Sequence, residues 1–364
     1  MQARAAPLRQ WLRLAHTPRL GPRAARALLD RFSSPDAIFD PASRAALGDF
    51  AGPDFADLLG REPEAATRAA CDLALGWLEG GPRRSLLTLA DPDYPAPLRE
   101  LADAPPLLYC HGRRELLGLA AVGLVGSRNA TRPGVLHARE LARDLARSGL
   151  AVVSGLARGI DTAAHAGALD APGATIAVLG TGIDRVYPAA NAELARRIGE
   201  EGLLLSEFAL GAPPVDRHFP RRNRIIAGIA RGVVVVEAAQ RSGSLITARL
   251  AAEAGRDVFA VPGPVRSPMS RGCHQLLRDG AMLVECAGDV LAGLLPGRAP
   301  PAPGPRACGP ESELLRALGP EPAAFDDILQ RTGVPAGDLA ALLLELELEA
   351  QIERLPGNRY LRVG

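Results

Sequence analysis

Short apolar runs separated by amphipathic segments fill the middle of the chain, from residue 86 to residue 284. The runs are Leu86–Leu89, Leu107–Cys110, Ala121–Val125, Ala151–Ser154, Thr175–Leu179, Leu203–Ser206, Val233–Glu237, Asp257–Val261 and Ala281–Val284. Their β-branched residues are typical of strands that are buried on both faces. The helical periodicity of Val135–Ser148 and Asn191–Glu200 fills gaps between runs, so we predict an α/β fold with a mostly parallel sheet.

A helical domain is predicted for residues 1–80, which are rich in Ala, Leu and Arg and end at Gly80-Gly81-Pro82. Within it, Leu20-Gly21-Pro22 resembles the turn of a helix-hairpin-helix or SAM-like module, with Pro22 at a helix start. Such a turn presents N–H groups to a DNA phosphate. One glycine stands where the motif often has two, so a helical packing domain without DNA contact is the alternative.

A Pro/Gly/Ala-rich linker, residues 296–310, is predicted between a central domain of residues 81–295 and a C-terminal domain of residues 311–364. The last domain shows a winged-helix pattern, with helices at Leu314–Leu318, Phe325–Arg331 and Ala336–Glu349 and a hairpin of Gln351–Leu355 and Arg359–Val363. Its third helix, which normally reads a DNA groove, carries acidic residues and no Arg. They are Asp338, Glu345, Glu347 and Glu349. Because DNA phosphates repel carboxylates, we favour protein docking over duplex recognition for this domain.

Glycine, serine or arginine follows nearly every predicted strand. The turns are Gly126-Ser127-Arg128, Ser154–Asp161, Gly180-Thr181-Gly182, Ser206-Glu207-Phe208, Ser242–Thr247 and Pro262-Gly263-Pro264. Ligands of open α/β sheets bind outside the carboxyl ends of the strands, where glycines allow close approach and serines or N–H groups bind phosphate. These turns predict a phosphate or nucleotide site. Neither G-x-G-x-x-G nor G-x-x-x-x-G-K-[ST] occurs, which argues against a nicotinamide enzyme or an ATP motor.

The segment from Arg217 to Thr247 concentrates candidate binding groups. Its first half carries Arg217, Arg221, Arg222, Arg224 and Arg231, and no carboxylate lies between Asp216 and Glu237. It ends in a Ser242-Gly243-Ser244 turn and Thr247, where backbone N–H groups can cradle an anion. Together with Phe219, these groups indicate a site for a phosphate chain that carries bases. A solvated arginine face on an ordinary helix is the alternative.

Composition limits the chemistry. The formal net charge is +1, so any nucleic-acid affinity must come from a local patch. Every basic residue is Arg, which excludes a Schiff-base or P-loop lysine and supplies planar donors suited to phosphate; Arg-biased codons are the other explanation. The dispersed cysteines are Cys71, Cys110, Cys273, Cys286 and Cys308, without a CxxC, which predicts free thiols and no metal site. Since no run reaches about 18 apolar residues and no secretion signal is present, we expect a cytoplasmic protein without membrane spans.

Several motifs follow one another in an order that resembles the DNA-processing protein A (DprA/Smf) family over about Leu86 to Leu291. They are VGSRNAT (Val125–Thr131), SGLARGIDTAAHAGAL (Ser154–Leu169), SEF (Ser206–Phe208), HFPRRNRIIAGIARGVVVVEA (His218–Ala238) and RSGSLITARLAAEAGRDVFAVPGP (Arg241–Pro264). The resemblance implies an extended Rossmann-like central domain that binds single-stranded DNA, commonly as a homodimer. It also implies protection of incoming strands during natural transformation, loading of the RecA recombinase, and neither established catalysis nor a cofactor.

The resemblance places the family's pocket arginine on Arg128 and its aromatic and basic helix start on Phe219, Arg222 and Asn223. Many relatives carry a lysine near Val215, which Arg217 would replace. The complete predicted DNA-binding set is Gly126, Ser127, Arg128, Arg158, Arg217, Phe219, Arg222, Asn223, Arg224, Ser242, Gly243, Ser244 and Thr247.

Physical chemistry supports these roles. Pro220 suits a helix start whose positive end faces the strand-edge crevice. Arg128 and Arg222 would clamp phosphates, and Phe219 would stack on a base. The alternatives are that Phe219 belongs to the core and that Arg222 pairs with Glu237.

Two other functions compete with DNA binding. One is a nucleotide-binding or nucleotide-hydrolysing enzyme, for which Glu237 and Glu253 are the candidate carboxylates; the PGGxGT signature of such hydrolases is absent. The other is a protein scaffold that works through its winged helix. Asp161 and His165 are four residues apart and could form an acid–base pair. No nucleophilic residue has a matching spacing, so a hydrogen bond on the helix surface is favoured.

Three further features are interpreted from their residue types. Cys273-His274 lacks metal-ligand spacing. Tyr187-Pro188 with Asn191 is a turn and helix start that is either structural or lines the crevice. A surplus of apolar residues makes Gln275–Leu277 and Ala281–Leu283 the expected dimer face.

Overall fold

The chain forms two compact units, Met1–Pro301 and Ala302–Gly364. The computed structural model describes residues 2–171, 174–295, 314–315, 317–319, 321–348 and 351–362, and its described side chains begin at Pro7. The predicted linker, residues 296–310, lies outside the described residues.

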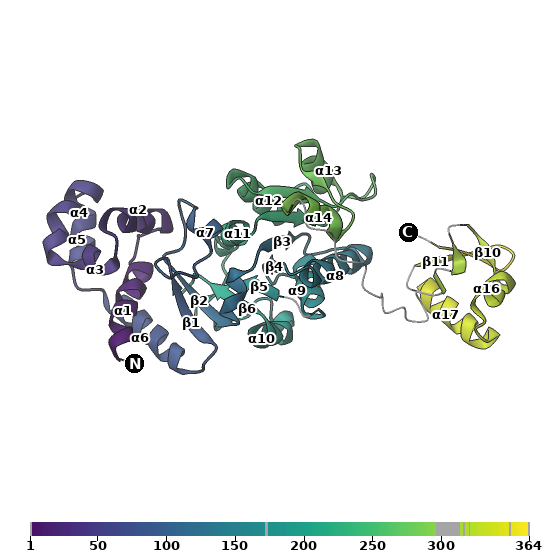
Figure 1. Cartoon of the computed structure of the whole chain (residues 1–364), viewed down its shortest axis with the longest axis horizontal. Coiled ribbons are helices and arrows are strands. Elements are labelled where there is room, and N and C mark those ends of the chain that lie inside the picture. The colour runs from purple at the N-terminus through teal and green to yellow at the C-terminus, as the bar shows by residue number, and fades with distance from the viewer. Residues whose placement is uncertain are drawn as a thin grey trace. The chain divides into compact units, whose positions relative to one another are not determined.

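A single nine-stranded sheet forms the centre of the first unit (Figure 1). The strands are β1 (Arg84–Thr88), β2 (Leu107–Gly112), β3 (Ala121–Val125), β4 (Ala151–Ser154), β5 (Ala174–Val178), β6 (Leu203–Ser206), β7 (Gly232–Val235), β8 (Asp257–Ala260) and β9 (Met282–Leu283). Their order is β1-β2-β6-β5-β4-β3-β7-β8-β9. The β1–β2 and β2–β6 pairs are antiparallel, and all the other pairs are parallel. Each predicted apolar run forms a strand, so the predicted mostly parallel sheet is confirmed.

The β-branched run of β7 is buried because helices cover both faces of the sheet. Val233 and Val235 belong to one hydrophobic cluster, whereas Val234 belongs to another on the opposite face. The first cluster includes residues of α7 (Ala96–Arg99), α11 (His218–Ile229), α12 (Gly243–Glu253) and α13 (Arg271–Arg278). The second includes residues of α8 (Arg132–Arg147), α9 (Ile160–Leu169) and α14 (Ala287–Leu294). Alternate valines therefore enter different helical layers, which explains why the run lacks polar positions.

The path of the chain reverses beside β3. After β3 it builds β4, β5 and β6 on one side, crosses back through α11, and builds β7, β8 and β9 on the other side. The carboxyl ends of β3 and β7 therefore flank a topological switch point, where open α/β sheets leave a crevice for ligands.

The N-terminal helices share a hydrophobic core with the antiparallel edge of the sheet. They are α1 (Gln2–His16), α2 (Pro22–Phe32), α3 (Pro35–Phe39), α4 (Arg44–Ala51), α5 (Pro53–Gly60) and α6 (Ala65–Glu79). Leu12 and Leu28 lie in one cluster with Leu107 and Tyr109 of β2, and His16 Nε2 lies 2.8 Å from the Tyr109 hydroxyl. The helices before residue 80, the predicted end of the N-terminal domain, and the sheet after it therefore share one hydrophobic core.

The second unit has the predicted winged-helix elements. They are β10 (Ala323–Ala324), α16 (Phe325–Thr332), α17 (Ala336–Leu348), β11 (Ile352–Leu355) and β12 (Arg359–Arg362), with strand order β10-β12-β11. Ile328, Leu339 and Tyr360 are buried in its own core. Two expectations, the full helix Leu314–Leu318 and the carboxylate of Glu349, fall wholly or partly outside the described residues.

Membrane spans and metal sites receive no support from the described part of the chain. None of its helices is both long and apolar enough to cross a bilayer. No cluster of ligating side chains there could hold a metal ion. Cys71, Cys110 and Cys273 are buried free thiols, and Cys286 is an exposed one.

Two buried histidines make stability depend on pH. Burial lowers the pKa of His16 to about 4 and that of His165 to about 3, because a protonated ring would lose its hydration. In the unfolded chain the histidine pKa is about 6.5, so below that pH the unfolded chain binds more protons than the folded protein. We therefore expect the free energy of unfolding to fall as the pH drops from about 6.5 toward about 4, by up to about 1.4 kcal/mol per pH unit for each histidine.

The measurement is urea unfolding of wild type and His165→Gln at several pH values. The difference between the two proteins isolates the contribution of His165 from that of the carboxylates, which titrate in the same pH range. The variant should lose less stability than wild type between pH 6.5 and 4.5. If both proteins lost the same free energy of unfolding over this pH range, His165 would accept a proton in the folded state as readily as in the unfolded chain.

Candidate nucleic-acid interface

A groove of about 450 Å³ lies at the switch point between β3 and β7. Ten predicted residues line it: Gly126, Ser127, Arg128, Phe219, Arg222, Asn223, Ser242, Gly243, Ser244 and Thr247. They come from the turn after β3 and from the first two turns of α11 and α12, with the residue that precedes α12. The structure thus brings together the motifs that the sequence spreads over more than a hundred residues.

The turn after β3 holds Arg128 at the groove wall. Ser127 N–H donates to the Glu237 carbonyl at 2.7 Å, which ties the turn after β3 to the turn after β7. Ser127 Oγ accepts from Asn129 N–H at 3.1 Å. Arg128 is exposed, and its Cζ lies 5.3 Å from the centroid of the Phe219 ring. This cation–π contact positions the guanidinium, which forms no ion pair with any residue in the described part of the chain.

Phe219 belongs to the groove wall rather than to the core. Its side chain is half-buried, and its ring centroid lies 5.7 Å from that of Tyr187. A Cβ on Gly180 would come within 2.8 Å of the Phe219 ring, so the glycine after β5 makes room for the aromatic side chain. The alternative that Phe219 is a core residue does not fit this exposure.

Arg222 is buried, with 4% of its surface exposed. Its Nη1 donates to the carbonyls of Gly155 and Val178, at the ends of β4 and β5, and its Nε donates to Asn223 Oδ1 at 3.1 Å. Burial lowers its pKa to about 10, while Asp161 works in the opposite direction. Arg222 therefore supports the groove floor from inside the protein, which corrects the expectation of a free phosphate clamp. It does not pair with Glu237 either.

The predicted surface pair Asp161 and His165 is buried. Asp161 Oδ2 accepts from the N–H groups of Gly155 at 3.1 Å and Ala157 at 3.3 Å. His165 Nε2 accepts from Leu156 N–H at 3.3 Å, so the hydrogen-bond network assigns the ring proton to Nδ1, 2.7 Å from Thr175 Oγ1. Burial raises the pKa of Asp161 and lowers that of His165. Both side chains shape the loop after β4, and Asp161 also lines the groove.

Three predicted arginines, Arg158, Arg217 and Arg224, lie outside the groove lining. Arg224 is 7% exposed; it pairs with the buried carboxylate of Glu207, and its Nη1 donates to the Asp103 carbonyl at 2.6 Å. Its predicted DNA contact is not supported, because these partners occupy its guanidinium on another side of α11. Arg217 is exposed at the N-cap of α11.

A second compartment of about 440 Å³ adjoins the groove. Arg158, the remaining predicted arginine, lines it together with Tyr187 and Pro188. This agrees with the expectation that the Tyr187 turn lines the crevice.

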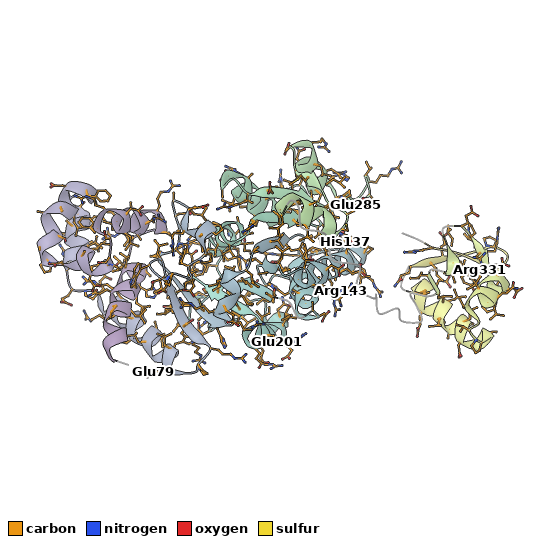
Figure 2. All side chains as sticks on the ribbon, in the orientation of Figure 1. Glu79, His137, Arg143, Glu201, Glu285 and Arg331 are labelled. Carbon is orange, nitrogen blue, oxygen red and sulfur yellow. The ribbon has the colours of Figure 1, made fainter. Side chains whose placement is uncertain are left out.

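The strand-end turns do not all face the groove. Ser206 Oγ donates to the Thr181 carbonyl at 2.6 Å, which ties the turns after β5 and β6 together. Phe208 stacks on His218 of α11 with ring centroids 4.1 Å apart, so these turns pack against the start of that helix. Pro262–Pro264 lines a separate cavity of about 460 Å³ with Glu237, His137 and Glu285; the last two are labelled in Figure 2.

The carboxylates proposed for the enzyme alternative lie outside the groove lining. Glu237 accepts from Thr131 N–H at 2.9 Å and Thr131 Oγ1–H at 2.6 Å, and so caps the start of α8. Glu253 pairs with Arg249 at 2.7 Å on the exposed surface of α12. The groove does contain Asp216, which is exposed at the rim and which sequence reasoning treated only as a boundary.

Arg222→Met should destabilise the fold. The change leaves the Gly155 and Val178 carbonyls without their shared donor and Asp161 without a nearby positive charge. We expect the free energy of unfolding to fall by about 2–4 kcal/mol, measured by urea denaturation. The exposed Arg217→Met is the matched control and should change stability by less than about 0.5 kcal/mol. Equal stabilities of the two variants would contradict a structural role for Arg222.

Comparisons with known proteins agree with the fold and with the motifs. Residues 85–295 match the family described as DNA recombination-mediator protein A, and residues 298–358 match the DprA winged helix domain. Protein Smf of Escherichia coli is 41% identical over 307 residues, which cover 81% of this chain and 82% of that protein. DNA processing protein DprA of Streptococcus pneumoniae is 50% identical over 205 residues, 56% of this chain and 72% of that protein.

Two of the similar solved structures are DprA proteins. The X-ray structure of DprA from Streptococcus pneumoniae has a TM-score of 0.59 at 43% identity and covers 70% of this chain and 92% of that one. DNA processing protein A from Helicobacter pylori, whose structure is described as giving insights into its single-stranded DNA binding mode, has a TM-score of 0.53 at 32% identity. It covers 58% of this chain and 96% of that one. The chain therefore belongs to the DNA recombination-mediator protein A family, the DprA/Smf proteins.

Proposed function

We propose that this protein binds single-stranded DNA in the groove at the β3–β7 switch point. The observation that carries the proposal is the exposed guanidinium of Arg128 held over the half-buried ring of Phe219. The ring offers a stacking surface for a base, and the guanidinium offers donors for the adjoining phosphate. Stacking suits every base, so binding should depend little on sequence.

Two helix starts add to the attraction for phosphate. The N-terminal turns of α11 and α12 both line the groove, and Asn223 Nδ2 donates to the Gly243 carbonyl at 3.4 Å. Ser242 Oγ lies 2.7 Å from Ser244 Oγ at the start of α12, where serine hydroxyls and early N–H groups can meet an anion. Positive helix ends from two directions favour a polyanion in this position.

The relative from Helicobacter pylori supports the same ligand, since its structure is described by its single-stranded DNA binding mode. The rival nucleotide enzyme lacks support, because Glu237 and Glu253 are held outside the groove lining. A duplex is also less suitable, because paired bases cannot offer their faces to Phe219.

We further propose that the protein protects incoming DNA and loads the RecA recombinase during natural transformation. The family's description as a recombination mediator supports a recombinase partner. Asp338 and Glu345 are exposed on α17, which has no Arg, so this helix suits a protein surface better than DNA. The buried free thiols of the described residues fit a reducing cytoplasm as the place of action.

The proposed assembly is a homodimer that uses the β9 edge of the sheet. Met282 is 39% exposed and Leu283 is 53% exposed, on an edge strand that pairs only with β8 among the described strands. Of the other expected interface residues, Gln275 is exposed, whereas Leu276 and Leu277 pack partly against the core. An exposed apolar edge is suited to a symmetric contact with a second copy.

Arg128→Ala should weaken the binding of a labelled oligothymidine, because it removes a phosphate donor and the partner of Phe219. We expect a loss of about 10- to 100-fold in fluorescence anisotropy at 100 mM salt. The dependence of log K on log salt should fall by about 0.7 per lost phosphate contact. Asp216→Asn, at the same rim, is the matched control and should tighten binding by about 2- to 5-fold. Unchanged affinity in both variants would place the DNA elsewhere.

Leu283→Arg should shift the protein from dimer to monomer in sedimentation velocity experiments, because a charge at the interface would be desolvated without a partner. Leu136→Arg is the control, since Leu136 is a leucine of similar exposure, 47%, on a different element, α8. A dimer that persists in Leu283→Arg but is lost in Leu136→Arg would move the interface to α8.

A further inference from the structure

The groove continues past Phe219 into the second compartment. The two compartments share Arg128, Asn129, Ala157, Phe219 and Arg222, so they form one continuous surface. Beyond this shared wall the first compartment ends at the start of α12, and the second ends at Tyr187 and Arg158. A ligand that fills only one compartment would leave half of this surface unused.

Tyr187 is a large aromatic side chain that the protein leaves exposed. It is 47% exposed, in a chain in which only 4% of residues are aromatic. Among the described residues its hydroxyl forms no hydrogen bond with the protein. Isolated exposed aromatics are ordinary, but this ring contacts the ring of Phe219, which lines both compartments.

The turn that carries Tyr187 is held in place from both sides. Thr181 Oγ1 donates to the Arg185 carbonyl at 2.6 Å before it. After it, Asn191 Nδ2 donates to the Leu156 carbonyl and to Thr162 Oγ1, both at 2.9 Å. These bonds anchor the turn to the loop after β4, so the ring is positioned before any ligand arrives. A preorganised ring loses little conformational entropy on binding.

The geometry of the two rings decides how a strand can use them. Their centroids are 5.7 Å apart and their planes are tilted by 38°. This is the separation of two aromatic rings in direct contact, so no base fits between them. A base must therefore stack on the free face of one of the rings. Two consecutive bases of one strand can then stack on the two rings, one base on each.

The charges follow the same path. Arg128 lines both compartments, and Arg158 is exposed in the second. We propose that Tyr187 is a second base-stacking platform, so that one strand crosses Phe219 with a phosphate at Arg128 and the next near Arg158. This inference rests on the proposed function and deepens it: the site recognises consecutive nucleotides of a single strand rather than one mononucleotide.

The test measures the binding of oligothymidines to the full chain by fluorescence anisotropy at two salt concentrations. Tyr187→Leu should weaken binding by roughly 5- to 100-fold, the range for loss of one base–aromatic stack. Its salt slope should stay unchanged because no charge is lost. Tyr187→Phe and Tyr187→Trp should bind within about 2-fold of wild type, since both keep a stacking face. Phe50→Leu, at a position 46% exposed in α4, is the control and should have no effect.

An oligonucleotide with abasic sites throughout separates stacking from other causes. Wild type and Tyr187→Leu should bind it equally, because it has no base for the tyrosine to meet. Arg158→Ala should reduce the salt slope on oligothymidine by about 0.7. A weaker Tyr187→Leu on both oligonucleotides would indicate a disturbed turn and overturn the stacking role.

The outcomes also separate this inference from the proposed function. If Tyr187→Leu binds like wild type while Arg128→Ala is weakened, the strand stays in the first compartment and the inference fails alone. If neither change has an effect, both proposals fail. Circular dichroism and thermal unfolding should show that the exposed Tyr187 position tolerates leucine.

Discussion

The buried guanidinium of Arg222 is the interaction on which the groove depends. One nitrogen donates to carbonyls at the ends of two parallel strands, β4 and β5, and the side chain starts from the helix that returns the chain across the sheet. A Cβ on Gly155 would collide with the guanidinium, so the loop after β4 can lie where it does only with glycine there. The positions of Phe219, one turn away on α11, and of the loop beside Arg128 both follow from this anchor.

Burying a charge is costly, and the surroundings of Arg222 show how the cost is offset. Desolvation lowers the pKa of Arg222, whereas Asp161 raises it. Asp161 is itself held by the N–H groups of Gly155 and Ala157, in the same loop whose carbonyl accepts from Arg222. Both side chains resist rearrangement, because moving either one would leave buried polar groups of this loop without their hydrogen-bond partners. The result is a groove floor that is fixed by hydrogen bonds within the protein.

The arginines divide into two classes that composition does not distinguish. Arg222 and Arg224 are buried and bind carbonyls or carboxylates of the protein, whereas Arg128 and Arg158 are exposed and line the two compartments. The guanidinium suits both tasks, since its fixed fork of donors fits backbone carbonyls as well as phosphates. A net charge of +1 is therefore compatible with a local site for a polyanion, because what matters is which cations remain unpaired.

The sequence by itself determined the strands, the two-sided burial of the sheet, the winged helix and most groove residues, because continuous apolar runs, glycine-rich turns and local motifs are short-range signals. Only the tertiary structure decided which arginines face the groove. Arg222 and Arg224 lie two residues apart on one helix, and their local sequence does not distinguish them. Arg222 nevertheless donates to strand-end carbonyls, whereas Arg224 pairs with Glu207. The burial of Asp161 and His165 and the contact of Tyr187 with Phe219 likewise depend on how distant loops pack, which no periodicity encodes.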